Sequence, residues 1–173
     1  MDTNKLLVLV IEDNREIRLS ARFILEDFGF LVDEVESPSH AIDWLMRNKA
    51  DLILLDMNFG RDTTSGEDGL SFLKWLRKKG FDIPVVAMTA WSNTELVVNA
   101  MRMGANDFIE KPWDNNRLNQ VLQQTLKLHT LHKDNLALHQ RLECTVPVLI
   151  WESEVMDKLV QQLSVVAPTD ANI

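Results

Sequence analysis

The sequence predicts an α/β fold in which a parallel five-stranded sheet is covered by helices on both faces. Short uninterrupted apolar runs, typical of strands buried on both sides, recur along the chain, for example at 6–11 and 52–55. Between these runs lie segments whose apolar residues recur at helical spacing. Strands that alternate with helices form right-handed βαβ units, so the strands are expected to be parallel.

The expected elements follow one another without an internal Gly-Pro linker. Strands are expected at 6–11, 30–35, 52–56, 83–88 and 107–110. Helices are expected at about 15–28, 37–47, 69–79 and 93–103, and a fifth helix follows residue 114 and continues to about residue 142. Asn14 and Asp114 are candidate N-caps for the first and last helices, and Gly29, Gly80 and Gly104 stand where three of the helices should end.

Composition limits the possible function. The chain has 173 residues, enough for one domain and an appendage, and its net charge of -8 argues against a nucleic-acid-binding surface. Cys144 is the only cysteine, which excludes a disulfide framework and a thiolate metal site. The apolar run at 6–11 is too short for a signal peptide or a membrane span. We therefore expect a cytoplasmic soluble protein.

Polar side chains stand at the ends of four of the predicted strands. Glu12 and Asp13 follow the first strand, Asp56 ends the third, Thr89 follows the fourth and Lys111 the fifth. The carboxyl ends of parallel strands share one sheet edge, where ligands bind in such folds. Three carboxylates brought together need a cation, and oxygen ligands suit Mg²⁺. A carboxylate in such a site can attack phosphorus and form an acyl phosphate.

Each of these residues also has an ordinary explanation. A single aspartate after a strand is usually a turn residue or a helix cap, an acidic pair is usually solvated, and Lys-Pro is a common loop dipeptide. The functional interpretation depends on their occurring together, in this order, each after its own strand.

The chain resembles a receiver domain of two-component response regulators over about residues 4–128. The matching segments are Val-Leu-Val-Ile-Glu-Asp-Asn at 8–14, Leu-Leu-Asp at 54–56, Met-Thr-Ala at 88–90 and Gly-Ala-Asn-Asp-Phe-Ile-Glu-Lys-Pro-Trp at 104–113. The resemblance implies a flavodoxin-like (CheY-like) fold with strand order 2-1-3-4-5 and a receiver domain at 1–128.

The resemblance also implies a role for each strand-end residue. Asp56 would accept a phosphoryl group from a sensor histidine kinase. Mg²⁺ would be bound by Asp56, Glu12, Asp13 and the backbone carbonyl of Asn58. The chain would then be a switch, and not an enzyme with a substrate of its own.

Phosphorylation is expected to shift a population between two conformations. Thr89, with Ala90 beside it, and Lys111 would contact the phosphoryl group, and the aromatic Phe108 would move into the gap left by Thr89. The Lys111–Pro112 bond is expected to be cis. The loop at 57–68 departs from the family pattern, because it lacks proline and is several residues longer. Asn58 and Trp91 occupy positions that, in the family, tune the lifetime of the phosphoryl group.

The last helix carries a short heptad pattern. It is expected to pack on its own sheet up to about residue 128 and to act beyond that as a helical linker, 129–145, that forms a coiled-coil dimer. The seam positions are Val121, Leu128, Leu131, Asn135, Leu138 and Leu142. His129 and His132 are expected on a solvated helix face and not at a metal site.

The segment 146–173 resembles the entry to the AAA+ domain of NtrC-class sigma-54-dependent activators. No Gly-x-x-x-x-Gly-Lys-[Ser/Thr] motif and no helix-turn-helix follow, so no ATP or DNA site is expected. We expect a truncated regulatory fragment of a transcription activator. In the full-length protein, AAA+ and DNA-binding domains and sigma-54 RNA polymerase would be its partners.

Two other functions remain open from the residues alone. A haloacid-dehalogenase-type phosphatase also uses a strand-end aspartyl phosphate, but it needs a second aspartate where this chain has Asn58. A pseudo-receiver would only bind partners, and the complete set of Glu12, Asp13, Asp56, Thr89 and Lys111 argues against it.

Overall fold

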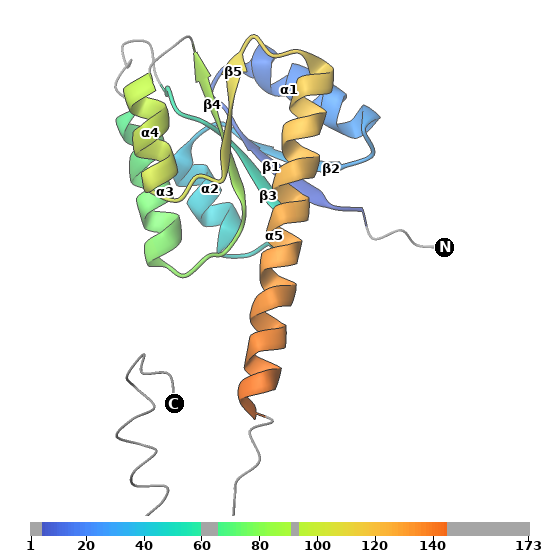
Figure 1. The fold of residues 1–173 in the computed structure, drawn as a ribbon. Coiled ribbons are helices and arrows are strands. Elements are labelled where there is room, and N and C mark those ends of the chain that lie inside the picture. Colours follow the sequence, from blue (N-terminus) through green and yellow to red (C-terminus); the bar gives the residue numbers. More distant parts are fainter. Residues whose placement is uncertain (1–4, 60–65, 91–93, 145–173) are drawn as a thin grey trace, which may run out of the picture. The chain divides into compact units, whose positions relative to one another are not determined.

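The computed structural model describes residues 5–59, 66–90 and 94–144, in which five strands alternate with five helices (Figure 1). The strands are β1 (Leu7–Ile11), β2 (Leu31–Val35), β3 (Leu52–Asp56), β4 (Val85–Ala90) and β5 (Asp107–Lys111). The helices are α1 (Arg15–Asp27), α2 (Pro38–Leu45), α3 (Glu67–Lys78), α4 (Thr94–Arg102) and α5 (Asn115–Cys144). All strands are parallel, in the order β2-β1-β3-β4-β5, which confirms the predicted fold class.

Helices cover both faces of the sheet, α1 and α5 on one and α2, α3 and α4 on the other (Figure 1). Successive side chains of a strand point to opposite faces, so each central strand contributes to two cores. In β3, Leu52 and Leu54 pack with α1 and α5, whereas Ile53 and Leu55 pack with α2 and α3. Burial on both faces explains why the sequence of β3 is an uninterrupted apolar run.

Side-chain caps begin α1 and α5 as the sequence predicts. The side chain of Asn14 accepts hydrogen bonds from the amides of Glu16 and Ile17, and Asp114 accepts one from the amide of Arg117. Such bonds satisfy amides in the first turn of a helix that have no partner within it.

Several boundaries differ from the prediction by one or two residues. Helix α3 begins at Glu67, two residues earlier than expected. Strands β4 and β5 extend through Ala90 and Lys111, because the pairing of Thr89 with Glu110 and of Ala90 with Lys111 continues the ladder. Thr89 and Lys111 therefore lie on strands and not in the loops that follow.

Arg77 joins two connections at the amino-terminal edge of β4 and β5. Its guanidinium donates hydrogen bonds to the carbonyl oxygens of Phe81 at 2.8 Å, Ile83 at 2.9 Å and Gly104 at 2.7 Å. These carbonyls belong to the α3–β4 and α4–β5 connections, so one side chain of α3 holds both. The partly buried charge is stabilised by several oxygen acceptors at once.

The chain divides into two compact units, Met1–Asp134 and Asn135–Ile173, of which the second is described only through the end of α5 at Cys144. The predicted division at residues 128 and 145 stays a prediction. Within the part of the chain that the structure describes, no helix is both long enough and apolar enough to cross a membrane.

Only the first part of α5 packs on the sheet. Leu118, Val121, Leu122 and Leu126 are buried in the core, whereas the side chains of Leu128, Leu131 and Leu138 are 59%, 55% and 58% exposed. The prediction that this helix covers its own sheet up to about residue 128 is therefore confirmed. It also follows that Val121, although it falls on the heptad pattern, is not available to a dimer seam.

Candidate functional site

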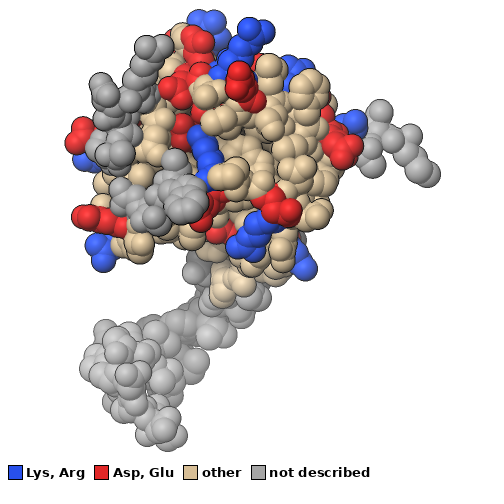
Figure 2. Space-filling view, turned by 90° about the horizontal axis from the view of Figure 1, so that it is seen from above, with Lys and Arg blue, Asp and Glu red and all other residues tan. Residues whose placement is uncertain are grey.

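Four strands bring the polar residues to one edge of the sheet. Glu12 and Asp13 directly follow β1, Asp56 is the last residue of β3, Thr89 lies near the end of β4, and Lys111 ends β5. Because all strands are parallel, these ends meet at the same side of the molecule. Figure 2 looks onto this side and shows acidic and basic side chains gathered next to one another.

The three acids form a tight group with one lysine. Carboxylate oxygens of Glu12, Asp13 and Asp56 all lie within 4.8 Å of one another. Lys111 Nζ lies 2.9 Å from Asp56 Oδ1 and forms a second ion pair with Glu12 Oε2. Glu12 and Asp56 are almost completely buried, whereas Asp13 is exposed, so water reaches the group from the Asp13 side.

The site destabilises the negative charges that it holds. Burial is the main reason that the pKa of Asp56 is raised above its ordinary value, although the Lys111 ammonium and the amide of Asn58 act in the opposite direction. Burial and the charge of Asp56 also raise the pKa of Glu12. The single ammonium of Lys111 therefore does not offset the negative charge of the three carboxylates, and a bound cation would stabilise their ionised forms.

The donor set fits Mg²⁺. Three ionised carboxylates and one ammonium leave two negative charges, and all ligands that the cluster offers are hard oxygen atoms. The backbone is held beside them: the Asn58 amide donates to Asp56 Oδ1 at 3.2 Å, and the Asn14 amide donates to Glu12 Oε1 at 3.2 Å. Among the described residues, this is the one group of acids, histidines or cysteines with metal-ligand spacing.

The residues expected to report the switch lie on β4 and β5. The side chain of Thr89 is buried, whereas Phe108 is 42% exposed, so the aromatic ring is directed outward. The Lys111–Pro112 bond is cis, as expected. Ala90 pairs with Lys111 in the ladder. Trp91 lies outside the described residues.

The unusual loop after Asp56 is described in part. Met57 and Phe59 are buried, so the chain first continues along the core after the strand ends, and residues 60–65 of the predicted loop lie outside the description. Gly69, in the first turn of α3, approaches this segment closely, because a Cβ atom there would lie 2.9 Å from the Cα of Met57. The glycine of the Asp-Gly-Leu sequence at 68–70 is thus explained by close packing against Met57, the residue that follows Asp56.

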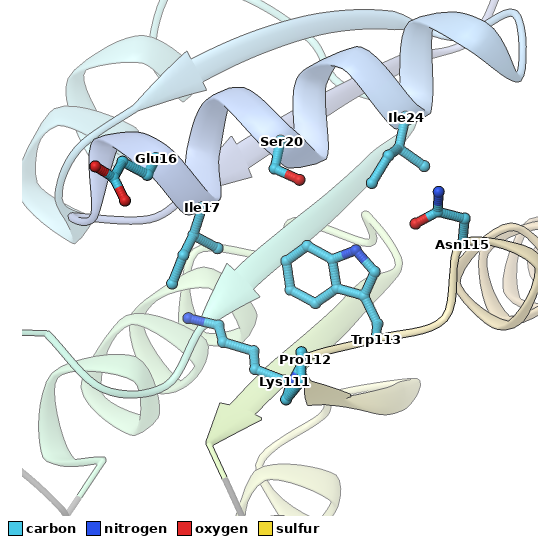
Figure 3. A pocket seen from close by; sticks show the side chains of 8 residues that line it. All are labelled: Glu16, Ile17, Ser20, Ile24, Lys111, Pro112, Trp113 and Asn115. Atoms are coloured by element: carbon cyan, nitrogen blue, oxygen red, sulfur yellow. The ribbon is translucent and has the colours of Figure 1, made fainter.

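A pocket of about 540 Å³ borders the acid cluster through Lys111 (Figure 3). Ile17, Ser20 and Ile24 of α1 line one side of it, and Pro112 and Trp113 line the other. The sequence analysis did not predict this pocket. Its walls come from segments far apart in the chain, so no local pattern reveals it, and the sequence shows Trp113 only as the last residue of the segment 104–113.

Comparison with known proteins gives a consistent result. The family model described as response regulator receiver domain matches residues 8–123. The chain is 32% identical to the regulatory protein AtoC of Escherichia coli over 139 residues, which is 80% of this chain and 29% of AtoC. It is 29% identical to the C4-dicarboxylate transport transcriptional regulatory protein DctD of Rhizobium meliloti, over 96% of this chain and 35% of DctD.

Solved structures agree with these matches. The crystal structure of NtrX from Brucella abortus superimposes with a TM-score of 0.75 at 30% identity, covering 98% of this chain and 36% of NtrX. The chain thus spans about a third of the length of AtoC, DctD and NtrX. The match over residues 8–123, together with the sheet order and the acid cluster, shows that the chain belongs to the response regulator receiver domain family.

Proposed function

We propose that Asp56 accepts a phosphoryl group from a sensor histidine kinase in a site that also binds Mg²⁺, and that this modification controls the self-association of a longer regulatory protein. The observation that carries the proposal is the position of Lys111 Nζ, 2.9 Å from Asp56 Oδ1 and ion-paired with Glu12, beside the carboxylate of Asp13. An aspartate that only formed a turn would not be expected to be buried next to a lysine and two further carboxylates.

The transfer itself is a substitution at phosphorus. A carboxylate oxygen of Asp56 forms a bond to phosphorus while the bond from phosphorus to a histidine nitrogen of the donor breaks, and the electron pair of that bond stays with the imidazole. Lys111 is placed to pair with the oxygens of the transferred group, because its ammonium already contacts the acceptor carboxylate. The buried hydroxyl of Thr89 would donate a hydrogen bond to the same group.

We place Mg²⁺ on Glu12, Asp13, Asp56 and the carbonyl oxygen of Asn58. When bound, the cation offsets the charge of the carboxylates and of the phosphoryl oxygens. The raised pKa values of Glu12 and Asp56 support this placement, because the cluster is short of positive charge without it.

The conformational response would start at Thr89 and end at the surface. A phosphoryl group adds close to two negative charges and three acceptor oxygens. Movement of Thr89 toward them would leave a gap for the ring of Phe108, which is now exposed on β5. The surface around α4, β5 and α5 would change with it, in a shift between two populations.

The exposed leucines of α5 support a dimer helix as the output. Leu128, Leu131 and Leu138 are exposed, and Asn135, also exposed, falls at a position where asparagine favours one parallel register. DctD is by its name a transcriptional regulatory protein. We propose a transcription activator of the NtrC class as the full-length protein, with AAA+ and DNA-binding domains and sigma-54 RNA polymerase as its partners.

Intact mass measured after incubation with Mg²⁺ and phosphoramidate tests the proposal. A stable gain of one phosphoryl group, lost in Asp56→Asn and retained in the exposed Asp51→Asn, is the expected result. Rapid consumption of the donor without a stable adduct would instead indicate a phosphatase. The absence of any reaction in a folded protein would indicate a pseudo-receiver.

A further inference from the structure

One side chain in the exposed part of α5, that of His129, is largely shielded from solvent. From Lys127 through His139 the side chains of α5 are exposed, except that of His129, which is only 12% exposed. Leu118, Leu122, Leu126 and His129 follow at intervals of three or four residues, so they lie on one face of the helix. His129 therefore forms the last turn of α5 that packs on the receiver domain.

The imidazole of His129 faces the connection between α3 and β4. Its Nε2 atom lies 3.8 Å from Asp82 Oδ2, a separation that is too long for a hydrogen bond. This nitrogen is shielded from water and has no hydrogen-bond partner among the described residues. Asp82 itself is 70% exposed, so solvent weakens its attraction for a charge on the ring.

The remaining charged groups around the ring are mostly positive. Arg77 of α3 approaches it from the domain, and Lys133 and His132 from α5 itself, while Asp82 is the acid that faces it. Arg77 cannot easily move away, since its guanidinium is bonded to the carbonyls of Phe81, Ile83 and Gly104. A proton on His129 would thus enter a partly dry place beside two permanent cations.

We propose that the protonation state of His129 controls how α5 docks on the receiver domain. When the ring is neutral, the helix turn that contains His129 stays packed against the α3–β4 connection. When the ring is protonated, this turn is released. The sign follows from linkage. Burial, Lys133 and Arg77 lower the pKa of His129 below its ordinary value of 6.5, and Asp82 only partly opposes them. The released helix, whose ring is solvated, binds the proton more tightly, so falling pH favours release.

This device is independent of phosphorylation and acts at the edge of the sheet opposite the acid cluster. It would change how much of α5 is free of the domain, and hence the length of helix available to a partner. It would operate in mildly acidic solution, because the ordinary histidine pKa is the upper limit of the transition.

Two measurements on the whole chain, without a phosphodonor, test the proposal. Proton NMR titration should give His129 a midpoint below the ordinary histidine value of 6.5. Hydrogen exchange of the amides at 126–134, expressed as protection factors to remove the intrinsic pH effect, should show a several-fold loss of protection between pH 7.5 and pH 5.5; one proton bound near pH 6.5 allows at most about a tenfold loss over this range.

Variants separate the histidine from general acid effects. His129→Gln should remove the pH dependence of protection, and His139→Gln should retain it. Asp82→Asn should lower the titration midpoint of His129 and move the loss of protection to lower pH. A His129 midpoint at or above 6.5, or an unchanged loss of protection in a folded His129→Gln protein, would overturn the proposal.

Discussion

Lys111 Nζ lies 2.9 Å from Asp56 Oδ1 while it also pairs with Glu12, so one ammonium serves two buried carboxylates. A phosphoryl oxygen on Asp56 would compete with Glu12 for this cation. The lysine is therefore both the principal stabiliser of the ionised acceptor and the group most directly affected by its modification.

Replacing Lys111 by methionine should slow phosphorylation. Without the ammonium, the pKa of Asp56 should rise further, because burial is then opposed only by weaker interactions. We expect a rate from phosphoramidate at least about tenfold lower at pH 7, equivalent to ~1.4 kcal/mol, and a pH profile moved to higher pH. Intact mass followed over time measures this rate, with exposed Lys78→Met as the matched control. Equal rates in the two variants would contradict the assigned role.

Stability should depend on pH through Glu12 in a defined direction. The native pKa of Glu12 is raised above 4.5, so between that value and the raised one the folded protein holds a proton that the unfolded chain releases. Stability from this group is therefore lost as pH increases through that window. In the presence of a chelator, Glu12→Gln should gain stability relative to the wild type as pH rises from 4 to 7.

Urea unfolding of both proteins across this pH range measures the difference. Mg²⁺ should reverse it, since the cation binds the ionised carboxylate and stabilises the folded wild type. A difference between the two proteins that is the same at every pH would show that the burial of Glu12 does not perturb its titration.

Gly69→Ala should disturb the segment after Asp56. The added Cβ would lie 2.9 Å from the Cα of Met57, closer than a real Cβ approaches, so α3 or that segment must shift. We expect a loss of stability of about 1–3 kcal/mol and slower phosphorylation of Asp56. The exposed Ser71→Ala in the same helix is the control for both the unfolding and the phosphorylation measurement. A phosphorylation rate as high as that of Ser71→Ala would show that the segment tolerates the shift.

Serine substitutions at Leu131 and Leu138 should weaken self-association without unfolding the domain. Both side chains are exposed, so the stability of the monomer should change by less than about 0.5 kcal/mol per site. Sedimentation equilibrium should show a dissociation constant at least about tenfold higher, equivalent to ~1.4 kcal/mol. Lys127→Ser is the matched control, since Lys127 is exposed on the same helix but lies off the heptad seam.

The sequence was sufficient to predict the features that depend on local pattern. The apolar runs of β1 and β3, the caps at Asn14 and Asp114 and the gathering of acids at the strand ends are confirmed, because period, capping and parallel topology are each short-range or topological rules. The extension of β4 through Thr89 was missed because it depends on pairing with β5, which no single segment encodes.

The environment of α5 shows a second limit of prediction. The sequence predicts a solvated face for His129, but its side chain is only 12% exposed and lies beside Asp82 of the α3–β4 connection. Val121 fits a heptad seam by spacing but is buried in the core. Spacing identifies a helix face, and only the fold decides what that face meets.

The contacts of Arg77 have a consequence for protein engineering. Since one guanidinium ties Phe81, Ile83 and Gly104, the lengths of the two connections at this rim are matched to each other. Inserting a reporter protein or creating new chain ends in either connection should therefore disrupt both. The turn between α2 and β3 makes none of these bonds, and we expect it to be the better place to open the chain for a biosensor.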